Sequence, residues 1–265
     1  MSAAPGLLAR RTRGRTARGR LAALDVFLAL TEAELLGGAR SGAVLVDVGF
    51  GDAPWTTLEM GKALAALGCP FRVVGVDLDE ARVRTAAAHA TEHVSFRQGG
   101  ALLPLVAHEQ VLVIRAMNVL RGYPEEAVAG AHASWGAHLL EGGLLLEGSS
   151  DARGDVLVAH VLRRRGARLE REALLFHTTF GRGFAPQLFR DWLPRDLRRR
   201  VTVGSAIHAF LEDWKRVWEE ARREGIRAPR EAFLASTRRL AAFRTDVRAE
   251  APLVERGFLL WRAPD

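Results

Sequence analysis

The sequence predicts an α/β protein built on a doubly wound, mostly parallel sheet, because three observations agree. Short apolar runs alternate with helical stretches between residues 40 and 150. Those runs end in acids or glycines, at the strand ends where a doubly wound sheet binds its ligand. After residue 150 the alternation gives way to a hairpin and helices. We therefore predict one domain over 21–265, with its core over 40–150, additions over 151–265 and a flexible basic arm over 1–20.

The N-terminal half contains the elements that define the sheet. Residues 21–36 place leucines at helical spacing, and Gly37 and Gly38 end that helix. The apolar run at 43–48 is too short for a buried helix, which predicts a strand covered on both faces. The alternation then continues as helix 54–67, strand 71–77, helix 79–90, strand 93–97, strand 110–115, helix 124–140 and strand 143–149.

The C-terminal part follows a different pattern. Residues 156–162 and 169–176 are strand-like runs joined by a basic turn, so we predict an antiparallel hairpin. Two helices follow, the second over 232–243, and a last strand over 257–261 is expected to close the sheet. An apolar stripe on the first helix predicts core packing rather than a partner surface. The stripe consists of Ile207, Phe210, Leu211, Trp214, Trp218 and Ala221.

A glycine loop follows the first strand and narrows the choice of ligand. Gly49 permits a sharp turn, and Gly51 lets the backbone approach a ligand closely, because neither residue carries a Cβ. A dinucleotide fingerprint would need a third glycine where Pro54 stands, and the sequence contains no phosphate-binding loop motif. Asp47 precedes the loop, and Asp77 ends the second strand, where an acid binds ribose hydroxyls. A ligand with a ribose and a cationic, amino-acid-like part accounts for both carboxylates.

These motifs resemble, in order, those of the class I S-adenosylmethionine-dependent methyltransferases, which have a Rossmann-like fold. The resemblance covers roughly residues 40 to 150 and rests on segments 47–51 (D-x-G-x-G), 74–77, 96–101, 111–114 and 139–146. It implies S-adenosylmethionine as the cofactor, and the implied contact residues are Asp47, Gly49, Phe50, Gly51, Asp77, Leu78, Gly100, Ala101 and Arg115. The sequence departs from the family pattern at Ala53, which replaces a third loop glycine, and at Gly100, where members often carry an acid.

The segment after the fourth strand, residues 114–124, is where such methyltransferases present the acceptor to the methyl group. The resemblance makes Asn118 and Tyr123 the candidate catalytic residues. Asn118 would orient cofactor or substrate, and Tyr123 would hydrogen-bond an acceptor. In the alternative interpretation Asn118 caps a turn and Tyr123 packs at a helix start. The sequence favours neither interpretation over the other.

Positive charge is concentrated in the arm. The formal net charge is +7, and six arginines without an acid in residues 1–20 leave +1 for residues 21–265. Those arginines are Arg10, Arg11, Arg13, Arg15, Arg18 and Arg20. Residues 10–20 are therefore a candidate RNA-binding segment, with a solvated or folded-back arm as the alternative.

The remaining composition argues against other classes of protein. No apolar run approaches the ~20 residues of a membrane span, and the lone Cys69 cannot form an internal disulfide. Both observations fit a cytoplasmic protein. Residues 89–93 match H-x-x-E-H, but a helix is expected to end there, so we predict no metal site.

Methyl transfer from S-adenosylmethionine to a small molecule is the leading hypothesis. The alternatives are an RNA methyltransferase that uses the basic arm and a non-catalytic cofactor-binding module. A nicotinamide oxidoreductase is disfavoured, because the loop lacks the phosphate-binding glycine. The lack of an obvious acid–base pair does not argue against methyl transfer, since the cofactor's sulfonium already makes the methyl group electrophilic.

Overall fold

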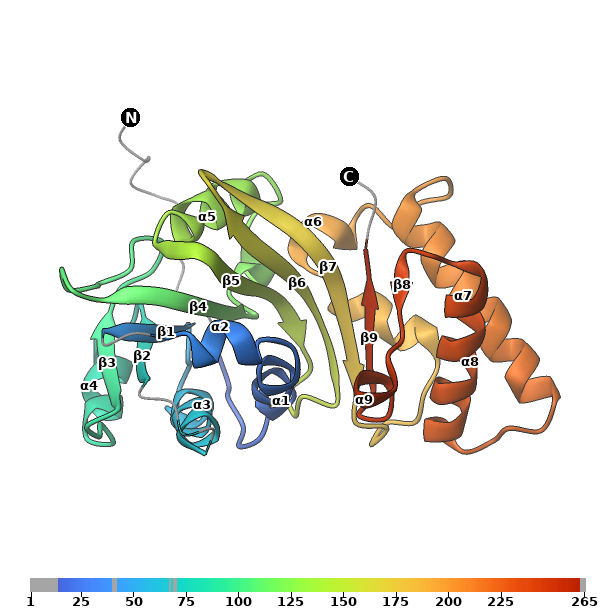
Figure 1. The fold of residues 1–265 in the computed structure, drawn as a ribbon, viewed down its shortest axis with the longest axis horizontal. Coiled ribbons are helices and arrows are strands. Elements are labelled where there is room, and N and C mark those ends of the chain that lie inside the picture. The colour runs from blue at the N-terminus through green and yellow to red at the C-terminus, as the bar shows by residue number, and fades with distance from the viewer. Residues whose placement is uncertain (1–13, 40–41, 67, 69–70, 263–265) are drawn as a thin grey trace.

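A nine-stranded sheet runs through the computed structural model, which describes residues 14–39, 42–66, 68 and 71–262 (Figure 1). Its strand order is β3-β2-β1-β4-β5-β6-β7-β9-β8. Strands β1 to β5 pair parallel, and β6 to β9 extend the same sheet antiparallel from β5. The strands are β1 (Ala43–Val48), β2 (Arg72–Asp77), β3 (Val94–Gln98), β4 (Gln110–Met117), β5 (Leu139–Ser150), β6 (Val156–Arg165), β7 (Arg168–Thr178), β8 (Val247–Arg248) and β9 (Phe258–Trp261).

Helices cover both faces of this sheet, which confirms the predicted doubly wound α/β fold. The helices of the parallel half are α1 (Ala22–Thr31), α2 (Ala33–Gly37), α3 (Trp55–Ala65), α4 (Glu80–Ala87), η1 (Leu120–Gly122) and α5 (Ala127–Gly136). Those of the antiparallel half are η2 (Pro186–Trp192), α6 (Arg195–Arg198), α7 (Ala206–Arg223), α8 (Pro229–Phe243) and α9 (Ala251–Val254).

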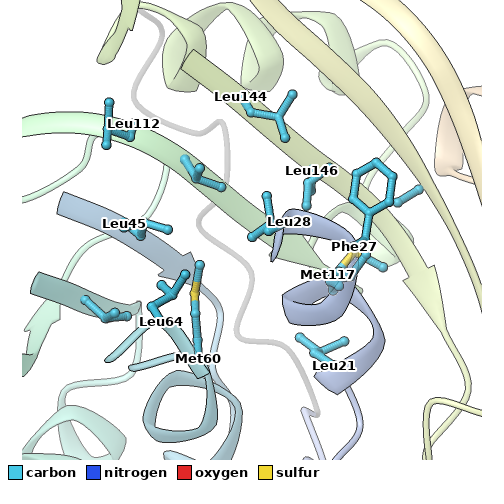
Figure 2. Packing of buried hydrophobic residues seen from close by; sticks show 14 of the residues in the cluster. Leu21, Phe27, Leu28, Leu45, Met60, Leu64, Leu112, Met117, Leu144 and Leu146 are labelled. Carbon is cyan, nitrogen blue, oxygen red and sulfur yellow. The ribbon is translucent and has the colours of Figure 1, made fainter. Parts of the chain in front are cut away.

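Two hydrophobic clusters lie on opposite faces of the parallel half. Strand β1 is buried on both faces, so Leu45 packs toward one cluster and Val46 toward the other. The Val46 side contains α5, whose Trp135 is fully buried. The Leu45 side contains α1, α3 and α4 and extends beneath β6, β7 and β9. Figure 2 shows its centre, where α1 and α3 converge on β1, β4 and β5 through Leu21, Phe27, Leu28, Leu45, Met60, Leu64, Met117 and Leu146.

The antiparallel half has its own cluster. Helix α7 packs its apolar stripe against the outer face of β6, β7 and β9, with Trp214 fully buried between Phe176 and Phe233. The stripe on α7 therefore forms core, as its spacing indicated. Of the predicted stripe residues, only Trp218 is partly exposed, and Val217 takes its place among the fully buried positions.

The predicted element boundaries differ from the structure at several places. The helix expected over 21–36 is interrupted at Glu32, which separates α1 from α2. The Glu32 carboxylate pairs with Arg163 of β6 at 2.8 Å. Strand β5 begins at Leu139 rather than 143, because Leu139 already pairs with Val111 of β4 across a bulge. The final strand β9 lies between β7 and β8, so the short strand β8 forms the sheet edge. Elements η2, α6, β8 and α9 are short and were not predicted.

Candidate functional site at the ends of the parallel strands

The glycine loop after β1 has the backbone that its sequence predicts. Gly49 and Gly51 adopt left-handed φ values of +73° and +90°, which side chains disfavour. A Cβ at Gly49 would lie 2.8 Å from Val119 in the segment after β4. Glycine is therefore required at Gly49 both for conformation and for space.

Asp47 lies at the centre of a buried network of polar side chains. Its Oδ2 accepts hydrogen bonds from the Thr56 and Thr57 hydroxyls at 2.9 and 2.8 Å. Arg115 Nε donates to Asp47 Oδ1 at 3.0 Å, and Arg115 Nη1 donates to Asp25 Oδ1 at 2.6 Å. The three charged residues are at most 5% exposed. The network thus joins α1, β1, α3 and β4. Asp47 and Arg115, both expected to contact the cofactor, instead bind other groups of the protein.

Burial sets the protonation of this network. Burial raises the pKa of Asp25 to about 7, although the neighbouring Arg115 opposes the shift. Burial alone would lower the pKa of Arg115, but Asp47 and Asp25 raise it above its ordinary value. Arg115 therefore stays charged and holds the two carboxylates together.

Asp77 of β2 meets the glycine loop of β1. The Gly51 N–H donates to Asp77 Oδ2 at 3.1 Å, and the Asp79 N–H donates to Asp77 Oδ1 at 2.9 Å. Arg82 Nη1 lies 3.6 Å from the same Oδ2 atom, and Asp77 is 4% exposed. The structure therefore brings together the acid and the second loop glycine, which the sequence placed at neighbouring strand ends.

The other residues expected at the cofactor line the same strand ends. Phe50 is buried and packs edge-to-face on Phe96, with ring centroids 5.3 Å apart. The Gly100 carbonyl accepts from Trp135 Nε1 at 3.2 Å, and the Ala101 carbonyl accepts from Ser134 at 2.8 Å. These bonds tie Gly100 and Ala101 to α5. Leu78, directly after Asp77, accepts from Gln98 through its carbonyl at 3.3 Å.

The two catalytic candidates occupy different environments. Asn118 has a left-handed φ of +62°, and its side chain binds both the N–H and the C=O of Ser150, at 2.9 and 3.0 Å. It thereby joins the ends of β4 and β5. Tyr123 is 5% exposed within the cluster on the α5 face, and its carbonyl accepts from Arg195 at 2.5 Å.

The end of the basic arm lies across the glycine loop; the sequence left a folded-back arm open as an alternative but did not indicate this position. The Asp52 N–H donates to the Gly14 carbonyl at 2.9 Å, and the Thr16 N–H donates to Asp52 Oδ1 at 2.8 Å. A Cβ at Gly51 would lie 2.8 Å from the same Gly14 carbonyl. No motif in residues 14–16 signals this contact, because it depends on the loop that the arm meets in three dimensions.

Other residues between 18 and 20 of the arm also pack on the protein. The Arg18 guanidinium lies 3.7 Å from the centroid of the Trp55 ring, in a cation–π contact. The Gly19 N–H donates to the Glu59 carboxylate at 2.9 and 3.0 Å. Arg20 is 6% exposed, and burial lowers its pKa although Asp47 opposes the shift. Residues 14–20 are thus folded back, whereas Arg10, Arg11 and Arg13 lie outside the described residues.

Little space remains between the arm and the loop. A cavity of about 20 Å³ lies there, lined by the arm, by residues 49–51 and by residues 117–119. Small-molecule sites measure roughly 300 Å³ or more. The glycines and Asp77 suit a ribose-bearing cofactor chemically, but the arm fills the space that such a molecule needs. Binding at this site therefore requires residues 14–18 to move away from the loop.

Comparison with known proteins gives structural matches alone. No protein-family model matches the chain, and no curated protein sequence matches it. Solved structures that match include a geranyl diphosphate methyltransferase in complex with GPP and sinefungin, at 25% identity, with a TM-score of 0.34, covering 48% of this chain and 45% of that one. The magnesium protoporphyrin IX methyltransferase ChlM from Synechocystis PCC 6803, with bound SAH, matches at 18% identity and TM-score 0.36, covering 49% and 54%.

A third match is LepI in complex with SAM, at 15% identity and TM-score 0.38, covering 49% of this chain and 35% of that one. The chain thus spans between 35% and 54% of the length of these three proteins. Activity, substrate and partners are accordingly proposals for this chain. No helix in the described part of the chain is long and apolar enough to cross a membrane.

Proposed function

We propose that the chain binds S-adenosylmethionine where β1, β2 and β4 end and passes its methyl group to a small molecule. The contact between the Gly49–Gly51 loop and Asp77 supports this proposal. The Gly51 N–H donates to Asp77 Oδ2 at 3.1 Å, so the loop and the acid lie at one site. The strand order reverses between β1 and β4, and doubly wound sheets bind ligands at such a switch point.

The residues divide into those that would contact the cofactor and those that support them. Asp77 would exchange its bond with the Gly51 N–H for bonds from ribose hydroxyls, and Leu78, Gly100 and Ala101 would border the base. Asp47 and Arg115 would hold the loop and the strand ends in place, because their hydrogen bonds go to Asp25 and to α3. Asn118 would shape the turn beneath the methyl group through its two bonds to Ser150.

The chemistry required of the protein is alignment rather than acid–base catalysis. The bound cofactor supplies an electrophilic methyl group on a sulfonium. The chain must orient the acceptor in line with that group and exclude water, and such alignment contributes on the order of 7 to 11 kcal/mol for well-oriented reactants. Such a reaction does not require a general base, and none is obvious among the candidate residues.

Calorimetric titration with S-adenosylmethionine and with NAD tests the proposal. We expect saturable binding of the former alone and a loss of affinity of about tenfold or more in Asp77→Asn, since one charge-assisted contact is removed. Glu231→Gln is the matched control, because this acid is exposed on α8, in the antiparallel half of the molecule. Unchanged affinity in Asp77→Asn would remove Asp77 from the site, and NAD binding would contradict the cofactor class.

A non-catalytic cofactor-binding module is the second candidate, and the arm across the loop favours it. Cofactor binding without methyl transfer to any acceptor in a broad screen would support that candidate. The RNA hypothesis is less favoured, because Arg18 and Arg20 of the arm contact the protein. An affinity for RNA that falls steeply with salt would restore it. A cytoplasmic location stays a prediction.

A further inference from the structure

A second, larger cavity lies on the other side of the arm. It measures about 520 Å³ and is bounded by the first turns of α1, the end of β7, the start of β9 and the loop after β5. This volume is within the range of roughly 300 to 1,000 Å³ that small-molecule sites occupy. Gly19 lines this cavity, whereas the next residue, Arg20, lines the small cavity at the glycine loop. Adjacent residues of the arm therefore line the two spaces.

One wall of the cavity is apolar. Ala22, Ala23 and Val26 of α1 line it together with Phe180, whose ring is partly exposed. Val26 is 41% exposed, which makes it one of the more exposed large hydrophobic side chains of the described chain. An apolar wall with one accessible aromatic ring suits a flat apolar molecule.

A buried histidine forms part of the floor. His177 of β7 is 5% exposed and packs on Phe258 with ring centroids 4.4 Å apart. Neither ring nitrogen makes a hydrogen bond of normal geometry with a described residue, although the Gly257 carbonyl and Asp155 lie near enough to influence its titration. Burial lowers the pKa of His177 to about 4, so the ring is neutral at pH 7, and both of its nitrogens are buried.

The rim is positively charged. Arg153, Arg230 and Arg256 line it together with one acid, Glu255. Arg230 donates to the Glu255 carbonyl at 2.7 Å and Arg256 to the Pro252 carbonyl at 3.0 Å, so neither guanidinium is neutralised by these bonds. The exposed Arg153 side chain makes no hydrogen bond or ion pair within the described residues. The rim therefore attracts an anion.

We propose that this cavity binds a small, flat, apolar carboxylate, with its apolar body against α1 and Phe180 and its carboxylate at Arg153. The apolar wall and the charged rim support this proposal, which is independent of the proposed methyl transfer. A second basic groove at the opposite end of β7, lined by Arg164, Arg168 and Arg171, has no phenylalanine among its described lining residues and serves as the comparison.

Calorimetric titration of the full chain with 2-naphthoate, without cofactor, tests this proposal. We expect saturable binding of one molecule per chain, with affinity reduced about tenfold in Arg153→Ala, as for loss of one charge-assisted contact. Val26→Asp should also weaken binding, because it places a charge in the apolar wall. Both side chains are exposed, so neither variant threatens the fold.

Arg168→Ala is the matched control, because it removes the same charge at the start of β7, whereas the cavity lies at the end of that strand. Unchanged affinity in this variant supports the proposal. Binding lost in Arg168→Ala and retained in Arg153→Ala would place the ligand in the second groove and overturn the proposal. Equal binding of 2-naphthylmethylamine, which carries the opposite charge, or no saturable binding of 2-naphthoate would also overturn it.

Discussion

Arg115 illustrates how a single buried residue supports the candidate site. Its guanidinium binds Asp47, Asp25 and the Thr56 carbonyl, and its side chain is fully buried. We expect Arg115→Met to lower the free energy of unfolding by roughly 3 to 5 kcal/mol, because it leaves Asp47 buried without its cation. Denaturant unfolding measures this loss.

The control for Arg115 is Arg84→Ala on α4. The Arg84 side chain is 75% exposed and pairs with Glu80 one helical turn away, and such surface pairs contribute roughly 0.3 to 0.5 kcal/mol. Equal losses in the two variants would contradict the assignment of the buried network as a support for the loop.

The lowered pKa of His177 should make the stability of the folded chain depend on pH. Its pKa is about 4 in the folded chain, lowered from 6.5 mainly by burial. Between these values the unfolded chain binds a proton that the folded chain does not, so stability falls as the pH drops from 6.5 toward 4. The full loss from this group is roughly 3 kcal/mol.

Thermal or denaturant unfolding of His177→Phe across this pH window checks the prediction. The variant keeps a ring beside Phe258 and removes the titrating group. As the pH falls from 6.5 to 4, the wild type should therefore lose more stability than the variant does. A difference that does not change between pH 4 and 6.5 would contradict the neutral, buried state of His177.

Among the larger elements, the arm is the one whose position controls access to the site. Residues 14–18 must leave the glycine loop for a cofactor to bind, since a cavity of about 20 Å³ remains there. Arg15 and Arg18 are trypsin sites within this segment. We expect S-adenosylmethionine to accelerate cleavage after both, measured by mass spectrometry over time, because displacement exposes the backbone. Slower cleavage in the presence of cofactor would show that the arm instead closes over the bound molecule.

The sequence predicted those elements whose signal is local. The apolar run of β1 and the apolar stripe of α7 identify a strand and a helix from the local pattern alone. Two glycines predict the loop after β1, and both adopt a left-handed φ. The orientation of the Asp47 carboxylate toward Thr56 and Arg115 was not predictable, because the motif fixes its place in the chain and not its partners. The contact between Gly14 and Asp52 likewise depends on residues 38 positions apart in the chain meeting after folding.

In the whole molecule, the parallel and antiparallel halves share one sheet and one of its hydrophobic clusters. Strand β5 pairs with β4 on one side and with β6 on the other. Leu157, Leu175 and Leu260 of the antiparallel half belong to the same cluster as Leu28 and Leu144 of the parallel half. We therefore propose that the C-terminal additions belong to the same folding unit as the parallel half.

A chain that ends at residue 151 tests this unity. We expect it to lack a native state, because it exposes the β5 edge and one side of the shared cluster. Near-UV circular dichroism and the dispersion of amide NMR signals measure the loss, with the full chain as the reference. A well-dispersed spectrum from the shortened chain would show that the parallel half folds by itself.

The most direct test of the central claim is calorimetric titration of S-adenosylmethionine into the full chain and into a chain that begins at Gly19. We expect both chains to bind and the removal of residues 1–18 to raise the affinity, because the cofactor no longer displaces the arm from the loop. Asp77→Asn in the shortened chain should reverse most of that gain. Failure of the shortened chain to bind the cofactor would contradict the assignment of the glycine loop and Asp77 as its site.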